Sequence, residues 1–242
     1  IILDILQRKN YIIRKSSRKK HYSHIIAANI DKAILFVTLR SPRTSTGFIN
    51  RFLVSAESFR IPVVIVFNKT DLYRTQEEEK SEHLIKLYES IGYKCLKTSL
   101  INNEGIEELK IELENSTCLV AGHSGVGKSS LLNVIDTNLN LQTAGLTKFT
   151  DKGSHTTTYA EMYPLLGGYI IDTPGIKEFG LENMDKNEIS HYFPEMRDLL
   201  EQCKYNNCLH LNELQCAVYD AFENGEIDES RYKTYLTLLN EV

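Results

Sequence analysis

The apolar residues of this chain follow two patterns, short continuous runs and longer stretches in which they recur at helical spacing. Continuous runs of the kind found in buried strands occupy residues 33–38, 62–67, 93–98, 117–121 and 168–172. Helical spacing occupies residues 45–59, 76–90 and 106–113, and a further helix begins near residue 130. The alternation of such strands with helices predicts an α/β fold whose mostly parallel sheet is covered on both faces.

Three regions depart from this alternation. Residues 1–15 mix apolar and charged positions, as an exposed strand or hairpin does. Residues 136–158 have no clear period, and we interpret them as a long mobile loop. After Phe179 the pattern changes to helices and loops. The sequence therefore predicts a second, smaller and mainly helical module in the C-terminal part.

Composition and charge narrow the classes of protein to consider. The chain has 242 residues, 42% of them hydrophobic, and a net charge of −4, which are ordinary values for a globular protein and do not indicate nucleic-acid binding by the whole chain. The charge is uneven, however, because residues 8–20 hold seven basic residues and no acidic one. This stretch either contacts phosphate groups or is simply a solvated face.

Localisation is constrained by what the sequence contains. No apolar span is long enough for a membrane helix, so we expect no membrane partner. Five cysteines, three of them clustered with a histidine, fit a reduced compartment, and we expect the cytoplasm. The chain opens without Met, so we expect a piece of a longer protein whose N-terminus, with any targeting signal, is out of view.

A glycine-rich loop connects the strand at 117–121 to the following helix and fits the pattern G-x-x-x-x-G-K-[ST]. Its residues are Gly122, His123, Ser124, Gly125, Val126, Gly127, Lys128, Ser129 and Ser130. In a strand–loop–helix context this pattern predicts a phosphate-binding loop, because backbone N–H groups and the helix N-terminus converge on phosphate oxygens. Lys128 is expected to reach the β- and γ-phosphates, and Ser129 to bind Mg²⁺. The alternative is a chance glycine turn before a helix.

The tetrapeptide Asn68-Lys69-Thr70-Asp71 follows the strand at 62–67 and resembles the N-K-x-D motif of GTPases. The Asp71 carboxylate offers two acceptors to guanine N1–H and its 2-amino group, a donor pair that adenine lacks. Lys69 is expected to lie along the base and Asn68 to tie this loop to the phosphate loop. Ser99 ends the next strand, in a segment that resembles the second guanine loop of GTPases. Alone, Asn68–Asp71 would equally fit a polar turn.

Two more segments complete the GTPase pattern. Asp172-Thr173-Pro174-Gly175 ends a strand and resembles D-x-x-G, so that Asp172 would hold Mg²⁺ through water and the Gly175 N–H would meet the γ-phosphate. One of Thr156, Thr157 and Thr158 is expected to close on Mg²⁺ and the γ-phosphate. The sequence does not distinguish them; we assign Thr157 to Mg²⁺ and Thr156 to catalysis.

The order of these motifs is unusual. In ordinary GTPases the guanine motif follows the phosphate loop, whereas here Asp71 precedes Gly122 by about fifty residues. The sequence therefore predicts a circularly permuted P-loop GTPase domain. Such a chain can still build the same site, because the termini of a domain are often close and the cut falls in a loop. The segment after Gly175 then leads directly into the C-terminal module.

The C-terminal module contains a cluster of metal-ligand residues, Cys203, Cys208, His210 and Cys216, in the pattern C-x₄-C-x-H-x₅-C. Three thiolates and one imidazole fit a closed tetrahedral Zn²⁺ site, which would be structural because it leaves no open position. A small helical module with a thin core gains folding energy from such a metal. The alternative is a set of unrelated buried cysteines. Cys95 and Cys118 lie in strands and are expected in the core.

Taken together these segments resemble the RsgA (YjeQ) family of circularly permuted GTPases. The segments that carry the resemblance are residues 27–31, 68–71, 122–130, 153–158, 172–175, 203–216, 225–227 and 231–232. The resemblance implies an N-terminal OB-fold of which residues 1–20 are the end, a GTPase domain at 21–183 and a helical zinc-binding domain at 184–242. It also implies GTP/GDP, Mg²⁺ and one structural Zn²⁺ as ligands, and the small ribosomal subunit with its rRNA as partner. The sequence does not give the oligomeric state, and we assume a monomer.

The expected chemistry is GTP hydrolysis that the small subunit stimulates. Ile176 stands where most small GTPases have the Gln that orients the attacking water, so we expect slow hydrolysis by the chain alone. His155 is the candidate to position water, unless it is a solvated loop histidine. The rival hypotheses are a nucleotide-latched rRNA-binding module with little catalysis, and a permuted GTPase that acts on the large subunit.

Overall fold

The computed structural model describes residues 4, 7–15, 23–141, 160–172 and 185–241. Its strands are β1 Tyr11–Lys15, β2 Ser23–Ala28, β3 Lys32–Val37, β4 Val63–Asn68, β5 Lys94–Thr98, β6 Thr117–Ala121, β7 Glu161–Leu165 and β8 Gly168–Asp172. Its helices are α1 Thr46–Ser58, α2 Thr75–Ser90, α3 Ile106–Leu113, α4 Lys128–Ile135, α5 Pro194–Arg197, α6 Ala217–Glu223 and α7 Glu229–Glu241. Short 3₁₀ segments are η1 Thr70–Leu72, η2 Lys186–Tyr192 and η3 Leu200–Gln202.

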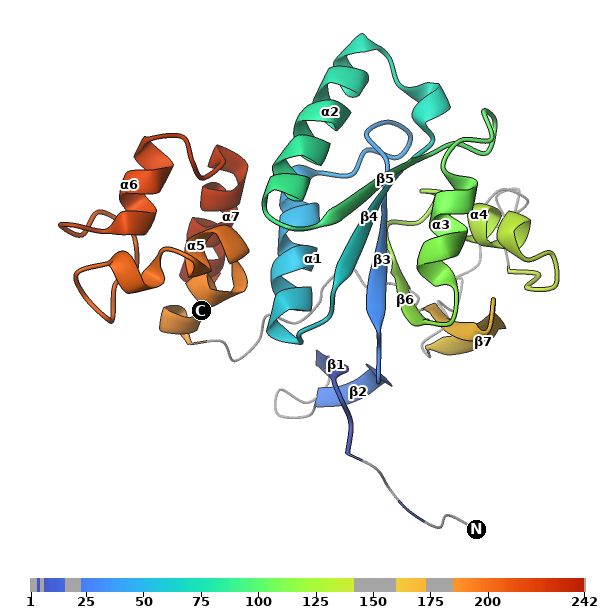
Figure 1. Cartoon of the computed structure of the whole chain (residues 1–242), viewed down its shortest axis with the longest axis horizontal. Helices are drawn as coiled ribbons and strands as arrows, with labels where there is room; N and C mark the ends of the chain where they lie inside the picture. Colours follow the sequence, from blue (N-terminus) through green and yellow to red (C-terminus); the bar gives the residue numbers. More distant parts are fainter. Residues whose placement is uncertain (1–3, 5–6, 16–22, 142–159, 173–184, 242) are drawn as a thin grey trace, which may run out of the picture.

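A six-stranded sheet with the order β5-β4-β3-β6-β8-β7 forms the centre of the larger domain. Every neighbouring pair is parallel except β7 and β8, which form an antiparallel pair. In Figure 1 helices flank this sheet on two sides. Strand β6 pairs with β3 on one side and with β8 on the other. The strand order therefore continues in opposite directions from β6, and the loop after β6 lies at this switch point. Ligands of open α/β sheets bind at such points, beyond the carboxyl ends of the strands.

Two hydrophobic clusters cover the two faces of the sheet, as the continuous apolar strands predict. Successive strand side chains point to opposite faces, so Leu35 belongs to one cluster and Ile34 to the other. The first cluster packs against α1 and α2, where Phe52 and Tyr88 are almost completely buried. The second packs against α3 and α4. The prediction of a parallel sheet covered on both faces is confirmed, with an antiparallel edge strand added.

An N-terminal hairpin of β1 and β2 precedes the sheet (Figure 1). Asn10 holds its base, because its side chain donates to the Ile30 carbonyl and accepts from the Ile30 N–H at 2.7 and 2.8 Å. Ile12, only 1% exposed, packs into the cluster on the α1–α2 face of the sheet. The hairpin therefore joins residues on both sides of the domain boundary predicted at residue 20, and β1 packs on the six-stranded sheet.

The C-terminal module consists of short helices and 3₁₀ segments around a third hydrophobic cluster. Phe193, Tyr235 and Leu238 lie in this cluster, and Val54 of α1 also belongs to it. In Figure 1 the module lies beside α1 and α2, the helices that cover one face of the sheet. The module therefore packs on the larger domain through α1. Within the described residues, no helix is long and apolar enough to cross a membrane.

Most predicted elements agree with the structure, with three differences. Strands β2 and β7 are not among the predicted elements. The apolar run of β2 is only four residues long, from Ile25 to Ala28, and β7 carries Glu161 and Pro164. The predicted mobile loop at 136–158 is ordered at its start, since the Asn133 side chain forms two hydrogen bonds, at 2.9 and 2.8 Å, with the Leu141 backbone. Residues 142–158 lie outside the described part.

Candidate nucleotide-binding and metal sites

The predicted phosphate-binding loop lies between β6 and α4. Lys128 is the first residue of α4, and its Nζ donates to the carbonyl oxygens of Gly122 and His123 at 2.8 and 3.1 Å. The Lys128 ammonium group therefore lies across the opening of the loop. In the phosphate-loop motif this is the position from which the lysine contacts phosphate oxygens. Val126 differs from its neighbours, because its side chain is completely buried in the core and offers only its backbone to a ligand.

Two glycines of this loop are required by the backbone and by close contacts. Gly122 has φ +136°, and a Cβ added there would lie 2.3 Å from the Phe36 carbonyl oxygen of the neighbouring strand. Gly127 has φ +99°, and its Cβ would lie 2.4 Å from Asn68 Nδ2. Any side chain at Gly127 would therefore separate the phosphate loop from the guanine motif.

The guanine motif is tied to this loop as predicted. Asn68 ends β4, and its Nδ2 donates to the Val126 carbonyl at 2.7 Å. Its Oδ1 in turn accepts a bond from the Thr98 hydroxyl at 3.0 Å. Ser99 Oγ donates to Asp71 Oδ1 at 2.6 Å, which orients the carboxylate proposed to read guanine. Three segments distant in sequence thus meet at the carboxyl end of the sheet.

A further loop belongs to this site, and sequence reasoning missed it. Residues 38–44, between β3 and α1, lie against the phosphate loop, because Lys69 Nζ donates both to the Ser41 carbonyl at 2.9 Å and to the Gly125 carbonyl at 2.6 Å. Tyr73 links this loop to the guanine motif. Its hydroxyl donates to the Asn68 carbonyl at 3.3 Å and accepts from the Leu39 N–H at 3.4 Å. Burial raises the pKa of Tyr73, which keeps the hydroxyl protonated as a donor. No motif in the sequence indicates this loop.

Asp172, the residue assigned to Mg²⁺, ends β8 and pairs in register with Val120 of the strand that precedes the phosphate loop. Burial lowers the pKa of Lys128, and the charge of Asp172 opposes that decrease. The carboxylate and the ammonium group therefore act on each other across the loop. Ser129, the other proposed magnesium ligand, lies in the first turn of α4.

The remaining predicted site residues lie outside the described part of the chain. They are His155, Thr156, Thr157 and Gly175, together with Ile176. Their assignments stay predictions. The described site consequently comprises the phosphate loop, the guanine motif, Ser99 and Asp172.

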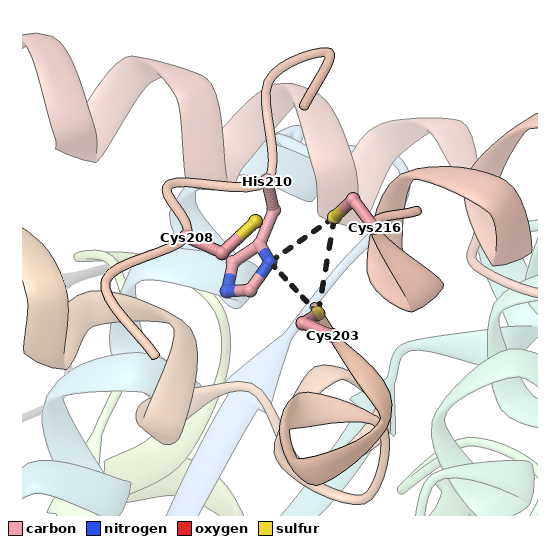
Figure 2. Close-up of side chains that lie close together, drawn as sticks. All are labelled: Cys203, Cys208, His210 and Cys216. Atoms are coloured by element: carbon pink, nitrogen blue, oxygen red, sulfur yellow. Dashed lines mark hydrogen bonds between the residues drawn. The ribbon is translucent and has the colours of Figure 1, made fainter. Parts of the chain in front are cut away.

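The four predicted zinc ligands lie together in the C-terminal module (Figure 2). One ligand atom from each of Cys203, Cys208, His210 and Cys216 lies within 4.8 Å of the others. Cys203 Sγ lies 3.6 Å from His210 Nδ1 and 3.9 Å from Cys216 Sγ, and His210 Nδ1 lies 3.3 Å from Cys216 Sγ. The edges of a tetrahedral Zn²⁺ site are about 3.5–3.8 Å. The donor set and its spacing are therefore compatible with one closed zinc site.

Burial and neighbouring hydrogen bonds define the surroundings of the cluster. Burial raises the pKa of the Cys216 thiol to about 12 and lowers the pKa of His210. The neutral imidazole is the form that binds metal, and a metal ion would deprotonate the thiols. Tyr232 and Tyr235 of α7 donate their hydroxyls, each at 2.7 Å, to the carbonyl groups of His210 and Leu209. These tyrosines hold the ligand loop. Tyr232 lies in a segment that carries the family resemblance, but no pattern in the sequence predicts this role for either tyrosine.

The strand order, the phosphate loop after β6 and the guanine motif after the earlier strand β4 define a circularly permuted P-loop GTPase. A family model described as RsgA GTPase matches residues 5–182. The chain therefore belongs to the RsgA GTPase family and is a GTP hydrolase.

Similar proteins support this assignment over almost the whole chain. "Small ribosomal subunit biogenesis GTPase RsgA" from Bacteroides fragilis is 50% identical over 241 residues, which are 99% of this chain and 78% of that protein. The protein of the same name from Flavobacterium psychrophilum is 49% identical, with 98% of this chain and 73% of that protein covered.

Two solved structures have the same fold. The crystal structure of YjeQ from Thermotoga maritima matches with a TM-score of 0.80 and 39% identity, covering 98% of this chain and 77% of that one. YloQ, described as a circularly permuted GTPase, matches with a TM-score of 0.77 and 30% identity, covering 98% of this chain and 73% of that one. The predicted family and fold are thus confirmed.

Proposed function

We propose that this chain acts in the biogenesis of the small ribosomal subunit, as a GTPase that binds the subunit and hydrolyses GTP faster when bound. The observation that carries the proposal is the joining of a permuted GTPase sheet to a Cys₃His module in one chain. Relatives that share about half of their residues with it, over nearly its whole length, are named for this process.

In the proposed complex, GTP binds at the carboxyl edge of the sheet. Asp71, oriented by Ser99, accepts hydrogen bonds from guanine N1–H and its 2-amino group. Lys128 exchanges its contacts with the Gly122 and His123 carbonyl groups for phosphate oxygens. Ser129 and, through water, Asp172 would hold Mg²⁺, which supplies positive charge to the β- and γ-phosphates.

Hydrolysis requires a water positioned in line with the γ-phosphate. We assign this role to His155, and contacts with the γ-phosphate and Mg²⁺ to Thr156, Thr157 and Gly175. Ile176 cannot hydrogen-bond that water, so the isolated chain is expected to turn over slowly. Contact with the subunit would bring these residues into position at the γ-phosphate and raise the rate.

The partner surface, in this proposal, includes rRNA, which the C-terminal module and the basic stretch at residues 8–20 would contact. One structural Zn²⁺ on Cys203, Cys208, His210 and Cys216 would hold the module folded. We further propose that the protein works in the cytoplasm as a monomer, with the domains 1–20, 21–183 and 184–242 as assigned from the sequence.

The decisive experiment measures multiple-turnover GTP hydrolysis by the full chain with and without purified small subunits. Stimulation by small but not by large subunits is expected, and the His155→Ala variant should lose the stimulated rate while still binding GTP. Equal rates with both subunits would contradict the proposal, and binding to small subunits without any hydrolysis would instead indicate a nucleotide-latched binding module. If His155→Ala keeps the stimulated rate, the assignment of the water-positioning residue is wrong.

A further inference from the structure

Helix α1 contacts the phosphate loop and the C-terminal module within its first two turns. Phe48, in the first turn, packs on the imidazole of His123 in the phosphate loop, with ring centroids 4.0 Å apart and planes tilted by 34°. Asn50, two residues further on, contacts α7 of the C-terminal module. Residues two apart on a helix point about 200° from each other, so α1 presents opposite sides to the two partners.

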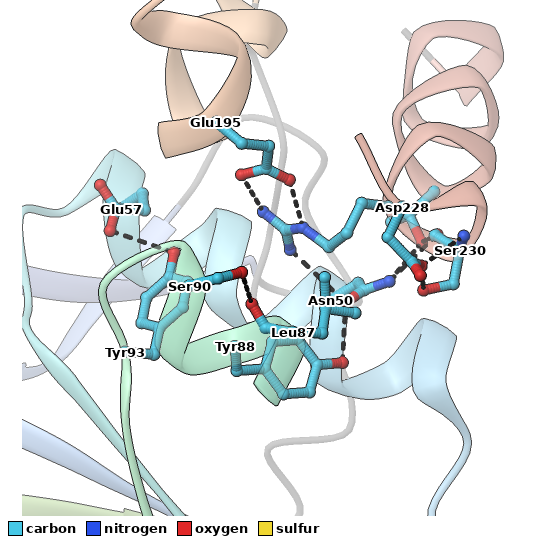
Figure 3. Close-up of polar contacts among 11 residues, drawn as sticks. Asn50, Glu57, Leu87, Tyr88, Ser90, Tyr93, Glu195, Asp228 and Ser230 are labelled. Carbon is cyan, nitrogen blue, oxygen red and sulfur yellow. Dashed lines mark hydrogen bonds and ion pairs between the residues drawn. The ribbon is translucent and has the colours of Figure 1, made fainter. Parts of the chain in front are cut away.

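Asn50 is completely buried and forms hydrogen bonds with both of its polar atoms (Figure 3). Its Nδ2 donates to the Ser230 carbonyl at 3.0 Å and to Thr234 Oγ1 at 3.1 Å. Its Oδ1 accepts from the Tyr88 hydroxyl of α2 at 2.9 Å and from Arg231 at 3.5 Å. An amide has two donor hydrogens and two acceptor lone pairs, so this side chain is held on every side.

Arg231 extends the same contact into the C-terminal module. Its guanidinium is fully buried, forms two hydrogen bonds with the Glu195 carboxylate at 2.6 and 3.2 Å, and lies 4.6 Å from the centroid of the Phe193 ring. Arg51, next to Asn50, pairs with Glu241 at the end of α7. The beginning of α1 is therefore fastened to α7, and Arg231 ties α7 in turn to Glu195 of α5.

We infer that Phe48 and Asn50 are positioning residues of the nucleotide site, and that docking of α7 on Asn50 holds the phosphate loop in its binding conformation through Phe48. This coupling runs through space across one helix, and it is separate from the covalent connection that follows Gly175. It goes beyond the proposed ribosomal function, because it concerns guanine-nucleotide affinity of the chain alone.

The coupling has a direction that can be measured. If α7 holds the start of α1, a weaker contact between α1 and α7 leaves Phe48 less well positioned. Part of the free energy of nucleotide binding is then used to order the phosphate loop, so the nucleotide binds more weakly. Coupling between two sites is also reciprocal, so bound nucleotide should protect the α1–α7 contact. Allosteric couplings typically change an affinity by about 5- to 150-fold.

The test uses the full zinc-loaded chain and titrates it with GDP by calorimetry, in the absence of ribosomes. Thr234→Val removes one acceptor of Asn50 with little change of volume, and Asn50→Ala removes the whole contact. Phe48→Leu keeps an apolar side chain but removes the ring that packs on His123. Each variant should bind GDP about five-fold more weakly or worse. Combining Thr234→Val with Phe48→Leu should add little to either alone, since both break one route.

Glu57→Gln is the matched control, because it weakens another contact between α1 and the module. Glu57 accepts from Arg197 of α5 at 3.2 Å, and it lies nine residues beyond Phe48, about 14 Å along the helix. It should bind GDP within two-fold of the unmodified chain. The inference is overturned if folded Thr234→Val binds GDP normally, if its effect and that of Phe48→Leu simply add, or if Glu57→Gln weakens binding equally. Small-subunit stimulation is absent from this assay, so its outcome is independent of the proposed function.

Discussion

The candidate nucleotide site and the Cys₃His cluster are built in opposite ways. The nucleotide site collects Asn68, Ser99, Gly127 and Asp172 from the carboxyl ends of several strands, which a large two-faced core holds in place. The Cys₃His cluster takes all four of its donor side chains from residues 203–216, the loop between η3 and α6. A site of the first kind can be shaped before its ligand binds, whereas a site of the second kind depends on its metal for its shape.

Removal of zinc tests this difference with the largest expected effect. Cys208→Ala, or chelation of the metal, should remove about 10 kcal/mol of apparent folding free energy from the C-terminal module. Hydrogen exchange should then show loss of protection in α6 and α7, while β3, β4 and β6 keep theirs. Cys95→Ser, which changes a cysteine outside the cluster, is the control and should leave the zinc content at one ion. Simultaneous loss of protection in the sheet would show that the shape of the nucleotide site also depends on the metal.

Guanine recognition by Asp71 has the next largest expected effect. Asp71→Asn replaces one acceptor by a donor, so guanine N1–H or its 2-amino group loses its partner, and GTP affinity should fall roughly 10⁴-fold. The same donor suits the 2-oxo group of xanthine, so xanthosine triphosphate should bind better than GTP. Competition binding with both nucleotides measures the exchange of preference. Glu79→Gln, an exposed carboxylate of α2, serves as control. An unchanged preference for GTP in the Asp71 variant would show that Asp71 does not contact the base.

The junction between phosphate loop and guanine motif can be opened at Gly127. Gly127→Ala introduces a methyl group 2.4 Å from Asn68 Nδ2 on a backbone with φ +99°, and it should cost about 2–3 kcal/mol of unfolding free energy. Nucleotide affinity should fall with it. Gly47→Ala is the matched control, since nothing lies within 4 Å of its Cβ position in α1, and it should stabilise the chain by about 0.5–1 kcal/mol. Denaturant unfolding measures the unfolding free energy of both variants. Equal changes in the two variants would show that Gly127 does not lie this close to Asn68.

The smallest expected effect concerns pH and the amino-terminal edge of the sheet. Glu112 bonds Lys32 and Lys94 at 3.0 and 2.6 Å; burial raises its pKa, but the hydrogen bonds from these two lysines outweigh burial and hold the pKa below its usual value. A carboxylate with a lowered folded pKa stabilises above its unfolded pKa, and this contribution is lost as the pH falls through the folded pKa. Glu112→Gln should therefore cost on the order of 1 kcal/mol at pH 7.

The difference between Glu112→Gln and the unmodified chain should begin to shrink as the pH falls below the usual glutamate pKa of about 4.3, and it should disappear below the lowered folded pKa of Glu112. Unfolding midpoints measured across that range provide the check. Lys110→Gln, which removes an exposed partner of Glu107 on the same helix, should have little effect at any pH. A difference that stays constant until both proteins unfold in acid would show that the ion pair is not its source. This measurement shows how much of the stability of the sheet comes from charge pairs outside the hydrophobic core.

Local patterns in the sequence predicted much of the fold and of the site. Residues 106–113, 117–121 and 168–172 form the predicted elements with the predicted bounds, because each combines a clear apolar pattern with flanking polar or turn residues. Edge strand β7 escaped prediction because a strand that is half exposed carries a weak apolar pattern. The loop at residues 38–44 escaped because its role arises from backbone carbonyl groups, which every residue has.

Short local patterns predict the chemistry of this protein, because the glycine pattern at 122–129, the Asp71 carboxylate and the Cys₃His set are residue types at short spacings along the chain. The contacts that those segments make with the rest of the molecule depend on the packing of the whole chain. The placement of Asn50 between α2 and α7, and of Phe48 against His123, joins residues far apart in the chain. Such contacts follow from the packing of whole elements around shared cores, and no local pattern of residues encodes them.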